Sequence, residues 1–254
     1  MRTNSDKLVS IVTPAYKAAR YIGAAIESVQ NQTHVDWEML IVDDRSPDDT
    51  AEVVEPLLKL DPRIRLIRLS VNSGPALARQ AALDAASGRY IAFLDSDDAW
   101  LPKKLEHQLL FMRMHGAALS FTQFRRITEN GNACGRLIRV PAQITYPQLL
   151  KNTAIATSTV VIDRDKTGIF KMTRTYYDDY VLWLALLKRG FTAYGLQEDL
   201  MRYRVVGKSV SRNKGKSAMH VWRTYREIEK LSAPYAAWCF IHYALQGYCK
   251  YRQF

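Results

Sequence analysis

The sequence predicts an α/β protein built on one mostly parallel sheet flanked by helices, with a basic helical extension at its C-terminal end. Short β-rich apolar runs alternate with segments of helical periodicity through the first 105 residues. Polar and acidic residues follow the ends of several predicted strands. With 254 residues, of which 48% are hydrophobic, the chain can bury a sizeable core.

The predicted elements alternate in chain order. Strands are expected at 9–16, 38–44, 64–70 and 89–95. Helices are expected at 19–33, 46–60 and 74–88, with Ser46 as an N-cap, Pro56 as a kink or end, and Gly88 closing the third helix. Residues 116–172 should complete the sheet with a further strand at 156–164, and a helix is expected over 176–190.

Three groups of side chains follow predicted strands: Pro14 to Tyr16, Asp43 with Asp44, and Asp95 with Asp97. In parallel sheets ligands bind beyond the carboxyl ends of the strands, so these groups should meet in one cleft. A rim of carboxylates repels itself unless a cation is shared, and oxygen ligands suit Mg²⁺ or Mn²⁺ bridging phosphate oxygens. The sequence has no glycine-rich phosphate loop. A metal ion would therefore have to hold the phosphates.

The net charge of +11 is concentrated in residues 200–254, which hold eleven Lys or Arg against two Glu. Such an extension fits nucleic acid, an anionic membrane surface or an anionic substrate. Its last segment, YAAWCFIHYALQGYCKY, is either an interfacial amphipathic helix or a helix packed on the catalytic domain. Three scattered cysteines, no secretory signal and no long apolar span predict a cytoplasmic protein, with peripheral attachment to the inner face of the membrane as the alternative.

Four stretches of the chain resemble the successive motifs of glycosyltransferase family 2. In chain order they are VSIVTPAYK, QTHVDWEMLIVDDRSPDDT, NSGPALARQAALDAASGRYIAFLDSDDAWLPKKLEHQ and YYDDYVLWLALLKRG. The resemblance implies a GT-A fold with a Rossmann-like sheet. It places a catalytic domain at 1–199, with a nucleotide-sugar half at about 8–105 and an acceptor half at about 106–199. The segment 200–254 resembles the tail of bacterial members that build capsule, exopolysaccharide or lipopolysaccharide.

The resemblance also implies roles for single residues on the donor side. Tyr16 matches the aromatic that stacks on the nucleotide base, with Pro14 and Ala15 shaping the backbone. Asp44 matches the carboxylate that accepts the uracil N3 hydrogen, with Asp43 beside it, and Arg79 matches a basic position facing the nucleotide. In the DxD element Asp95 points to the ribose, Ser96 follows it and Asp97 binds the metal, while the role of Asp98 stays open.

The implied reaction is a single displacement with inversion at the anomeric carbon. Asp179 is the candidate general base that deprotonates the attacking sugar hydroxyl. It lies in the first turn of the predicted helix, where the helix dipole favours a carboxylate. The expected donor is a nucleotide-sugar, with UDP-sugars foremost, and the expected acceptor is a glycan on a polyprenyl diphosphate.

Three other functions stay open at this stage. A nucleotidyltransferase of related fold would need a basic glycine-rich loop near the first strand, which is absent. A nucleic-acid-binding protein would explain the charge, but no recognition motif accompanies the basic tail, so we expect no nucleic acid partner. A catalytically inactive sugar-nucleotide binder is disfavoured because Asp97 and Asp179 are both present.

Overall fold

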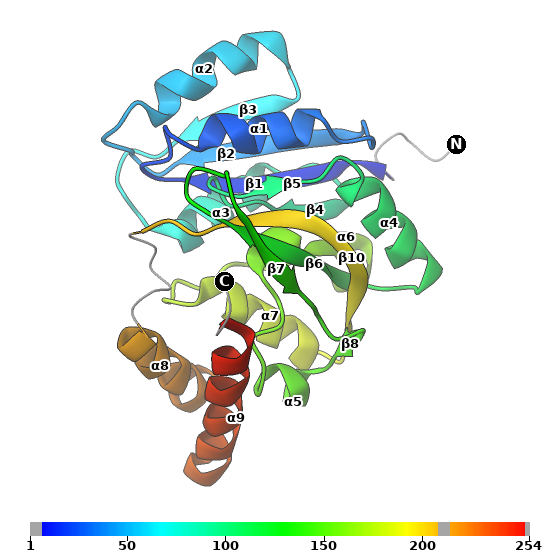
Figure 1. Cartoon of the computed structure of the whole chain (residues 1–254), viewed down its shortest axis with the longest axis vertical. Coiled ribbons are helices and arrows are strands. Elements are labelled where there is room, and N and C mark those ends of the chain that lie inside the picture. The colour runs from blue at the N-terminus through cyan, green and yellow to red at the C-terminus, as the bar shows by residue number, and fades with distance from the viewer. Residues whose placement is uncertain (1–6, 208–213, 252–254) are drawn as a thin grey trace.

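The structure is a computed structural model that describes residues 7–207 and 214–251. Figure 1 shows one large twisted sheet with helices on both faces and a pair of helices extending from it at the C-terminal end. The main path of the sheet has the strand order β3-β2-β1-β4-β9-β6-β10-β5, with β7 added beside β6 and β8 beside β10. Strands β3, β2, β1 and β4 run parallel to one another, as do β6 and β10. The predicted mostly parallel α/β fold is confirmed.

The first half of the chain follows the predicted alternation. Its strands are β1 (Val9–Ala15), β2 (Trp37–Asp43), β3 (Ile64–Arg68), β4 (Tyr90–Phe93) and the short β5 (Ala99–Trp100). Its helices are α1 (Ile22–Gln30), α2 (Thr50–Leu60), α3 (Pro75–Ala85) and α4 (Lys104–Met114). Because β1 pairs with both β2 and β4, the ends of these three strands lie side by side.

The second half completes the sheet and covers it. Its strands are β6 (Leu119–Ile127), β7 (Cys134–Ile138), β8 (Gln143–Ile144), β9 (Val161–Asp163) and β10 (Ala193–Arg204). Its helices are α5 (Tyr146–Leu149), the 3₁₀ turn η2 (Thr157–Thr159), α6 (Arg164–Thr167) and α7 (Asp178–Lys188). Strand β9 runs antiparallel to both β4 and β6 and so joins the two halves into one sheet.

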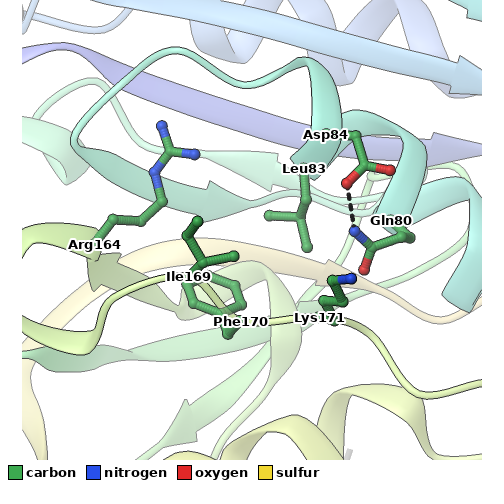
Figure 2. Close-up of a pocket in the computed structure, with 7 residues that line it drawn as sticks. All are labelled: Gln80, Leu83, Asp84, Arg164, Ile169, Phe170 and Lys171. Carbon is green, nitrogen blue, oxygen red and sulfur yellow. Dashed lines mark hydrogen bonds between the residues drawn. The ribbon is translucent and has the colours of Figure 1, made fainter.

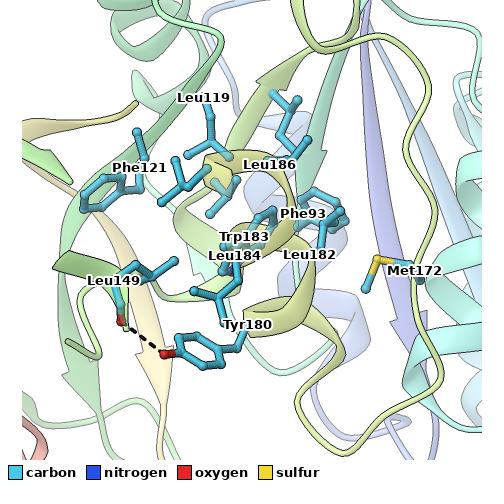
Figure 3. Close-up of a cluster of buried hydrophobic side chains, with 14 of the residues drawn as sticks. Phe93, Leu119, Phe121, Leu149, Met172, Tyr180, Leu182, Trp183, Leu184 and Leu186 are labelled. Carbon is cyan, nitrogen blue, oxygen red and sulfur yellow. Dashed lines mark hydrogen bonds between the residues drawn. The ribbon is translucent and has the colours of Figure 1, made fainter. Parts of the chain in front are cut away.

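Helix α7 lies buried against the sheet and is apolar on nearly every side, as expected for a helix enclosed by other elements. Figure 3 shows its side chains among those of the neighbouring strands. The ring of Trp183 meets the edge of Phe93 from β4, with centroids 5.3 Å apart. This packing fixes the start of α7 relative to the end of β4, where the predicted site residues lie.

The C-terminal extension is helical in its described part. It contains α8 (Lys214–Arg223), a π-helical turn (Thr224–Ile228) and α9 (Ala233–Tyr251). The expected boundary at residue 199 falls inside β10, so the last residues of this strand belong to the sheet. Ala236 and Cys239 of α9 are fully buried against the domain. Among the described helices, none is long and apolar enough to cross a membrane.

Some of the predicted features lie outside the described residues, and others differ from the structure. Lys208 and Arg212 of the basic extension lie outside the described residues, as does Arg252. The strand predicted at 156–164 is wrong in its first half, where a 3₁₀ turn precedes the short β9. Ser46 does not cap α2, which begins at Thr50; its hydroxyl instead accepts a hydrogen bond from the Lys17 amide.

The close packing around Gly195 in β10 predicts that a larger side chain there lowers the stability of the protein. A Cβ at this residue would lie 2.1 Å from the carbonyl oxygen of Pro141, whereas a Cβ at Gly23 in α1 would meet nothing within 4 Å. Gly195→Ala should therefore lower the free energy of unfolding by about 1–3 kcal/mol. Gly23→Ala should raise it by about 0.5–1 kcal/mol, because alanine favours the helix. Urea denaturation of the two variants checks this, and equal effects would contradict the close approach.

Candidate active site

Arg79 is the centre of the candidate site. It lies on α3 with its side chain only 8% exposed, and its guanidinium bridges two carboxylates. Nη2 donates to Oδ1 of Asp95 at 2.6 Å, and Nη1 donates to Oδ2 of Asp178 at 2.7 Å. Asp95 follows β4 and Asp178 begins α7, so one side chain joins three elements far apart in the sequence.

The electrostatics explain why this buried arginine stays charged. Burial alone would lower the pKa of Arg79, but the negative charges of Asp95, Asp178 and Asp179 outweigh it and hold the pKa above its usual value. Burial raises the pKa of Asp178, and the positive charge of Arg79 opposes that rise. The group therefore depends on all its members, because removing one leaves an unpaired buried charge.

The predicted nucleotide side lies at the ends of β1 and β2. Tyr16 is 46% exposed directly after β1, beyond the buried Ala15 and the half-buried Pro14. An exposed aromatic at this edge is available for stacking on a base. Asp43, the last residue of β2, and Asp44, which follows it, are both buried.

Those two acids also hold the loops around the site. The carboxylate of Asp44 accepts the backbone N–H groups of Ser73 and Gly74, each at 2.7 Å, and so fixes the turn that begins α3. Oδ1 of Asp43 accepts the N–H of Ser46 at 3.0 Å. By these bonds both residues stabilise the loops, a structural role that the sequence prediction did not include. Each carboxylate oxygen keeps a further lone pair that can accept a hydrogen bond from a ligand.

The DxD element forms a tight turn after β4, closed by the Asp98 N–H donating to the Asp95 carbonyl at 3.1 Å. Asp95, Ser96 and Asp97 are partly exposed on this turn. Burial raises the pKa of Asp97 to about 6, and the negative charge of Asp95 adds to the rise. A nearby cation would stabilise the charged form of this carboxylate and lower its pKa again.

Asp98 differs from Asp95 and Asp97 in its burial and its hydrogen bonds. Its side chain is buried, and it accepts hydrogen bonds from Oγ of Ser158 at 2.6 Å and from the Arg204 N–H at 2.9 Å. Burial raises the pKa of Asp98 well above its usual range, with the charges of Asp97 and Asp95 contributing. Asp98 joins the turn to η2 and β10, and we assign it this structural role.

The candidate base Asp179 lies in the first turn of α7, next to Asp178. Its Oδ2 accepts a short hydrogen bond from the hydroxyl of Thr157, and its Oδ1 accepts the N–H of Tyr180 at 2.7 Å. Because Arg79 holds Asp178 near the end of β4, it also keeps the neighbouring Asp179 near the DxD turn. The structure therefore groups Asp95, Asp97, Arg79 and Asp179 at one edge of the sheet.

Sequence reasoning missed three residues of this site. Ser158 accepts the Asp95 N–H at 3.0 Å, donates to Asp98, and receives the Trp100 indole N–H on its carbonyl at 2.7 Å. Thr157 orients Asp179, and Nε of Arg204 donates to the Asp97 carbonyl at 2.8 Å. Three consecutive hydroxyl residues in ATSTVVIDR were the available signal, since small polar residues in an apolar run are unusual.

The residues present fit a divalent metal ion that is shared with a phosphate group. No group of three His, Cys, Asp or Glu side chains able to hold a metal exists among the described residues. Mg²⁺ typically binds one or two carboxylates together with substrate phosphates and water, so it needs no such group. The carboxylate of Asp97 is a partly exposed oxygen donor that forms no ion pair within 4.0 Å among the described residues, since Arg204 donates to its backbone carbonyl instead.

A small pocket of about 50 Å³ lies beside α3, and it is separate from the candidate site. Figure 2 shows it between Gln80 and Asp84 of α3 and the segment Ile169 to Lys171. None of the predicted site residues lines it.

The fold and the site together define a class of protein, the nucleotide-sugar-dependent transferases of GT-A fold. The chain belongs to glycosyl transferase family 2, whose model matches residues 10–181. The predicted family, fold and type of enzyme are thereby confirmed.

Full-length relatives support this assignment. The chain is 48% identical over 244 residues to Bacillus subtilis TuaG, named as a teichuronic acid biosynthesis glycosyltransferase, with 95% of this chain and 96% of the relative covered. It is 40% identical over 218 residues to Escherichia coli WfgD, named as a UDP-Glc:α-D-GlcNAc-diphosphoundecaprenol β-1,3-glucosyltransferase, with 85% of each chain covered.

Solved structures agree on the fold. The complex of S. aureus TarS 1–349 with UDP-GlcNAc superposes with a TM-score of 0.71 at 17% identity, covering 95% of this chain and 72% of that one. The mannosyltransferase PcManGT from Pyrobaculum calidifontis, in complex with GDP-Man and Mn²⁺, gives a TM-score of 0.70 at 15% identity, covering 96% and 70%.

The Arg79 bridge predicts a large stability effect. Arg79→Met should lower the free energy of unfolding by about 3–5 kcal/mol, because Asp178 is left charged and buried. The double variant R79M/D178N should recover part of the loss. Arg68→Met is the matched control, since its ion pair with Glu55 at 2.6 Å is about half exposed and should contribute less than about 1 kcal/mol. Equal losses for R79M and R68M in urea denaturation would refute the bridge.

The raised pKa of Asp97 predicts a pH dependence of stability in metal-free protein. Folding raises this pKa from an ordinary value near 3.8 to about 6, so the folded state binds more protons between the two values. Stability should therefore increase as the pH falls from about 7.5 to about 5.5, and Asp97→Asn should show a smaller increase. Urea midpoints at both pH values check this. An increase in D97N as large as that of the parent would show that another group causes it.

Proposed function

We propose that this protein transfers a sugar, with inversion, from a UDP-sugar to a hydroxyl group of a diphosphate-linked glycan during cell-surface polysaccharide synthesis. The observation that carries the proposal is the Arg79 bridge, since it brings Asp95 of the DxD turn and the first turn of α7 into one site. A donor-side acid and a candidate base on facing elements are the arrangement that a direct displacement requires.

The donor would bind at the ends of β1, β2 and β4. We assign base stacking to Tyr16, a hydrogen bond to the base to Asp44 with Asp43 supporting its loop, and the ribose to Asp95, with Pro14, Ala15 and Ser96 forming the adjoining backbone. Arg79 faces this region while holding Asp95. The preference for UDP rests on WfgD and on TarS, whose names give UDP-Glc and UDP-GlcNAc.

Asp97 would hold a divalent cation, Mg²⁺ or Mn²⁺, which supplies charge neutralisation for the departing diphosphate when bound. Asp179 would take the proton from the attacking hydroxyl, and the Thr157 hydroxyl keeps its carboxylate oriented. Arg79 would keep the pair Asp178 and Asp179 near the end of β4 as the substrates bind.

The acceptor proposal rests on WfgD and on the related WfaP, 36% identical over 247 residues, both named for acceptors on diphosphoundecaprenol. Such a lipid stays in the bilayer, so we place the protein peripherally on the inner face of the membrane. Four apolar side chains of α9 lie along one exposed stripe: Tyr235, Trp238, Ile241 and Leu245. This apolar stripe favours lipid over nucleic acid. From Ala233 to the C-terminus the sequence has no acidic residue, which favours an anionic over an uncharged surface.

Replacing Asp179 tests the catalytic assignment. Asp179→Asn should reduce transfer from UDP-glucose to a GlcNAc-diphosphate acceptor by about 100-fold or more, the usual contribution of a general base. Protection against thermal unfolding by UDP with Mn²⁺ should persist, because Asp179 is not on the donor side. Transfer is assayed by product formation with and without a chelator. Full transfer by D179N would refute the base, and full transfer with chelator would refute the metal.

The α9 stripe predicts membrane binding. The double variant W238E/I241E should weaken binding to vesicles containing phosphatidylglycerol at least about tenfold, because two half-exposed apolar side chains lose their insertion into lipid. Leu60→Glu is the matched control, since Leu60 is 79% exposed on α2, far from the stripe. Vesicle co-sedimentation at low and high salt checks this. Equal binding of the double variant and the parent would refute the stripe as a membrane contact.

A further inference from the structure

A pocket of about 180 Å³ lies between the segment that leads into α7 and the helices of the C-terminal extension. Its lining includes Thr175, Tyr176, Tyr177, His220, Arg223 and Glu227. The last three belong to α8 and the π-helical turn, beyond the residues that the family model matches. Single-turn π-helical segments occur frequently at functional sites.

Three side chains of this pocket, those of Thr175, Arg223 and Glu227, have polar groups without a partner among the described residues. Oγ1 of Thr175 is buried without a hydrogen-bond partner among the described residues. No carboxylate of the described chain lies within 4.0 Å of the Arg223 guanidinium, and no cation lies that close to Glu227. The buried Thr175 hydroxyl costs free energy unless something binds it. The Arg223 and Glu227 side chains are exposed and so are free to bind a polar ligand.

The pocket also has an aromatic wall. The rings of Tyr176 and His220 stack with centroids 3.8 Å apart and planes 5° apart, and Tyr177 meets Tyr176 edge to face. The stack joins the segment before α7 to α8 and so holds the two sides of the pocket together. A flat aromatic face beside hydrogen-bonding groups suits a sugar ring, which has apolar C–H faces and hydroxyl edges.

The position of the pocket connects it to the reaction. Tyr177, which lines the pocket, is the N-cap of α7, and the candidate base Asp179 follows it two residues later. The exposed stripe of α9 is on the other helix of the same extension. In Figure 1, α8 and α9 extend together from the domain below α7.

We infer that this pocket is the acceptor subsite and binds a sugar ring joined to a diphosphate. The ring lies on the Tyr176 wall and hydrogen-bonds to Thr175 and Glu227, while Arg223 pairs with the diphosphate. The acceptor hydroxyl then faces Asp179. This inference rests on the proposed function, because the glycan acceptor comes from it.

Direct binding tests the subsite without depending on turnover. The probe is GlcNAc 1-diphosphate esterified to a short alkyl chain, titrated calorimetrically into the full chain. Arg223→Ala should weaken its binding about tenfold or more, the value of a hydrogen bond to a charged group. Thr175→Val should weaken it about three- to tenfold, the value of a hydrogen bond between neutral groups. T175V removes a hydroxyl that has no partner, so it should fold as well as the parent.

Arg226→Ala is the matched control. It removes the same charge three residues further along the same helical segment, and both arginines are exposed, but Arg226 donates to the Leu231 carbonyl and does not line the pocket. Its affinity for the probe should change less than about twofold. The inference is overturned if the parent does not bind the probe, if R223A and T175V bind it as the parent does, or if R226A weakens binding as much as R223A.

Donor binding separates this result from the proposed function. UDP with Mn²⁺ should protect R223A and T175V against thermal unfolding as well as it protects the parent. Loss of that protection in both variants would assign the pocket to the donor and overturn the inference. Selective loss of probe binding would uphold the subsite even if UDP-glucose proved not to be a donor, in which case only the proposed function would fail.

Discussion

The buried guanidinium of Arg79 is the interaction on which the site depends. It is held between Asp95, at the end of β4, and Asp178, at the start of α7. An ion pair of this kind contributes little net stability, because desolvation offsets much of the attraction, but breaking it is costly. It therefore acts chiefly as a constraint on position. With it in place, the DxD turn and the candidate base are held at one edge of the sheet.

A second constraint comes from the η2 turn. Ser158 binds the backbone of Asp95, the side chain of Asp98 and the indole of Trp100, while Thr157 binds Asp179. Two adjacent hydroxyls thus serve the donor side and the base side at once. A 3₁₀ turn suits this task because it has three residues per turn, so neighbouring side chains point about 120° apart and reach different partners. Catalytic groups held by such supporting hydrogen bonds lose little freedom when substrate binds.

The charge of the chain is divided between two regions. Acidic side chains gather around Arg79, where the proposed metal ion and diphosphate would meet, while eleven of the basic residues follow residue 199. The helical extension combines these charges with an exposed apolar stripe on α9 and a pocket beside α7. A lipid-linked acceptor would need all three features, since its lipid, its diphosphate and its sugar have different chemistry. The extension is thus suited to bring that acceptor to Asp179.

The sequence by itself determined the order of strands and helices, the edge at which Tyr16, Asp44 and Asp97 lie, and the family. These depend on local periodicity and on motifs within short stretches. Only the tertiary structure decided that Asp98 is buried as a structural link, that residues 157–159 form a turn, and that Arg79 joins Asp95 to Asp178. These contacts join residues between 16 and 99 positions apart. No local pattern reports them, because they form only when the packing of α7 on the sheet brings the partners together.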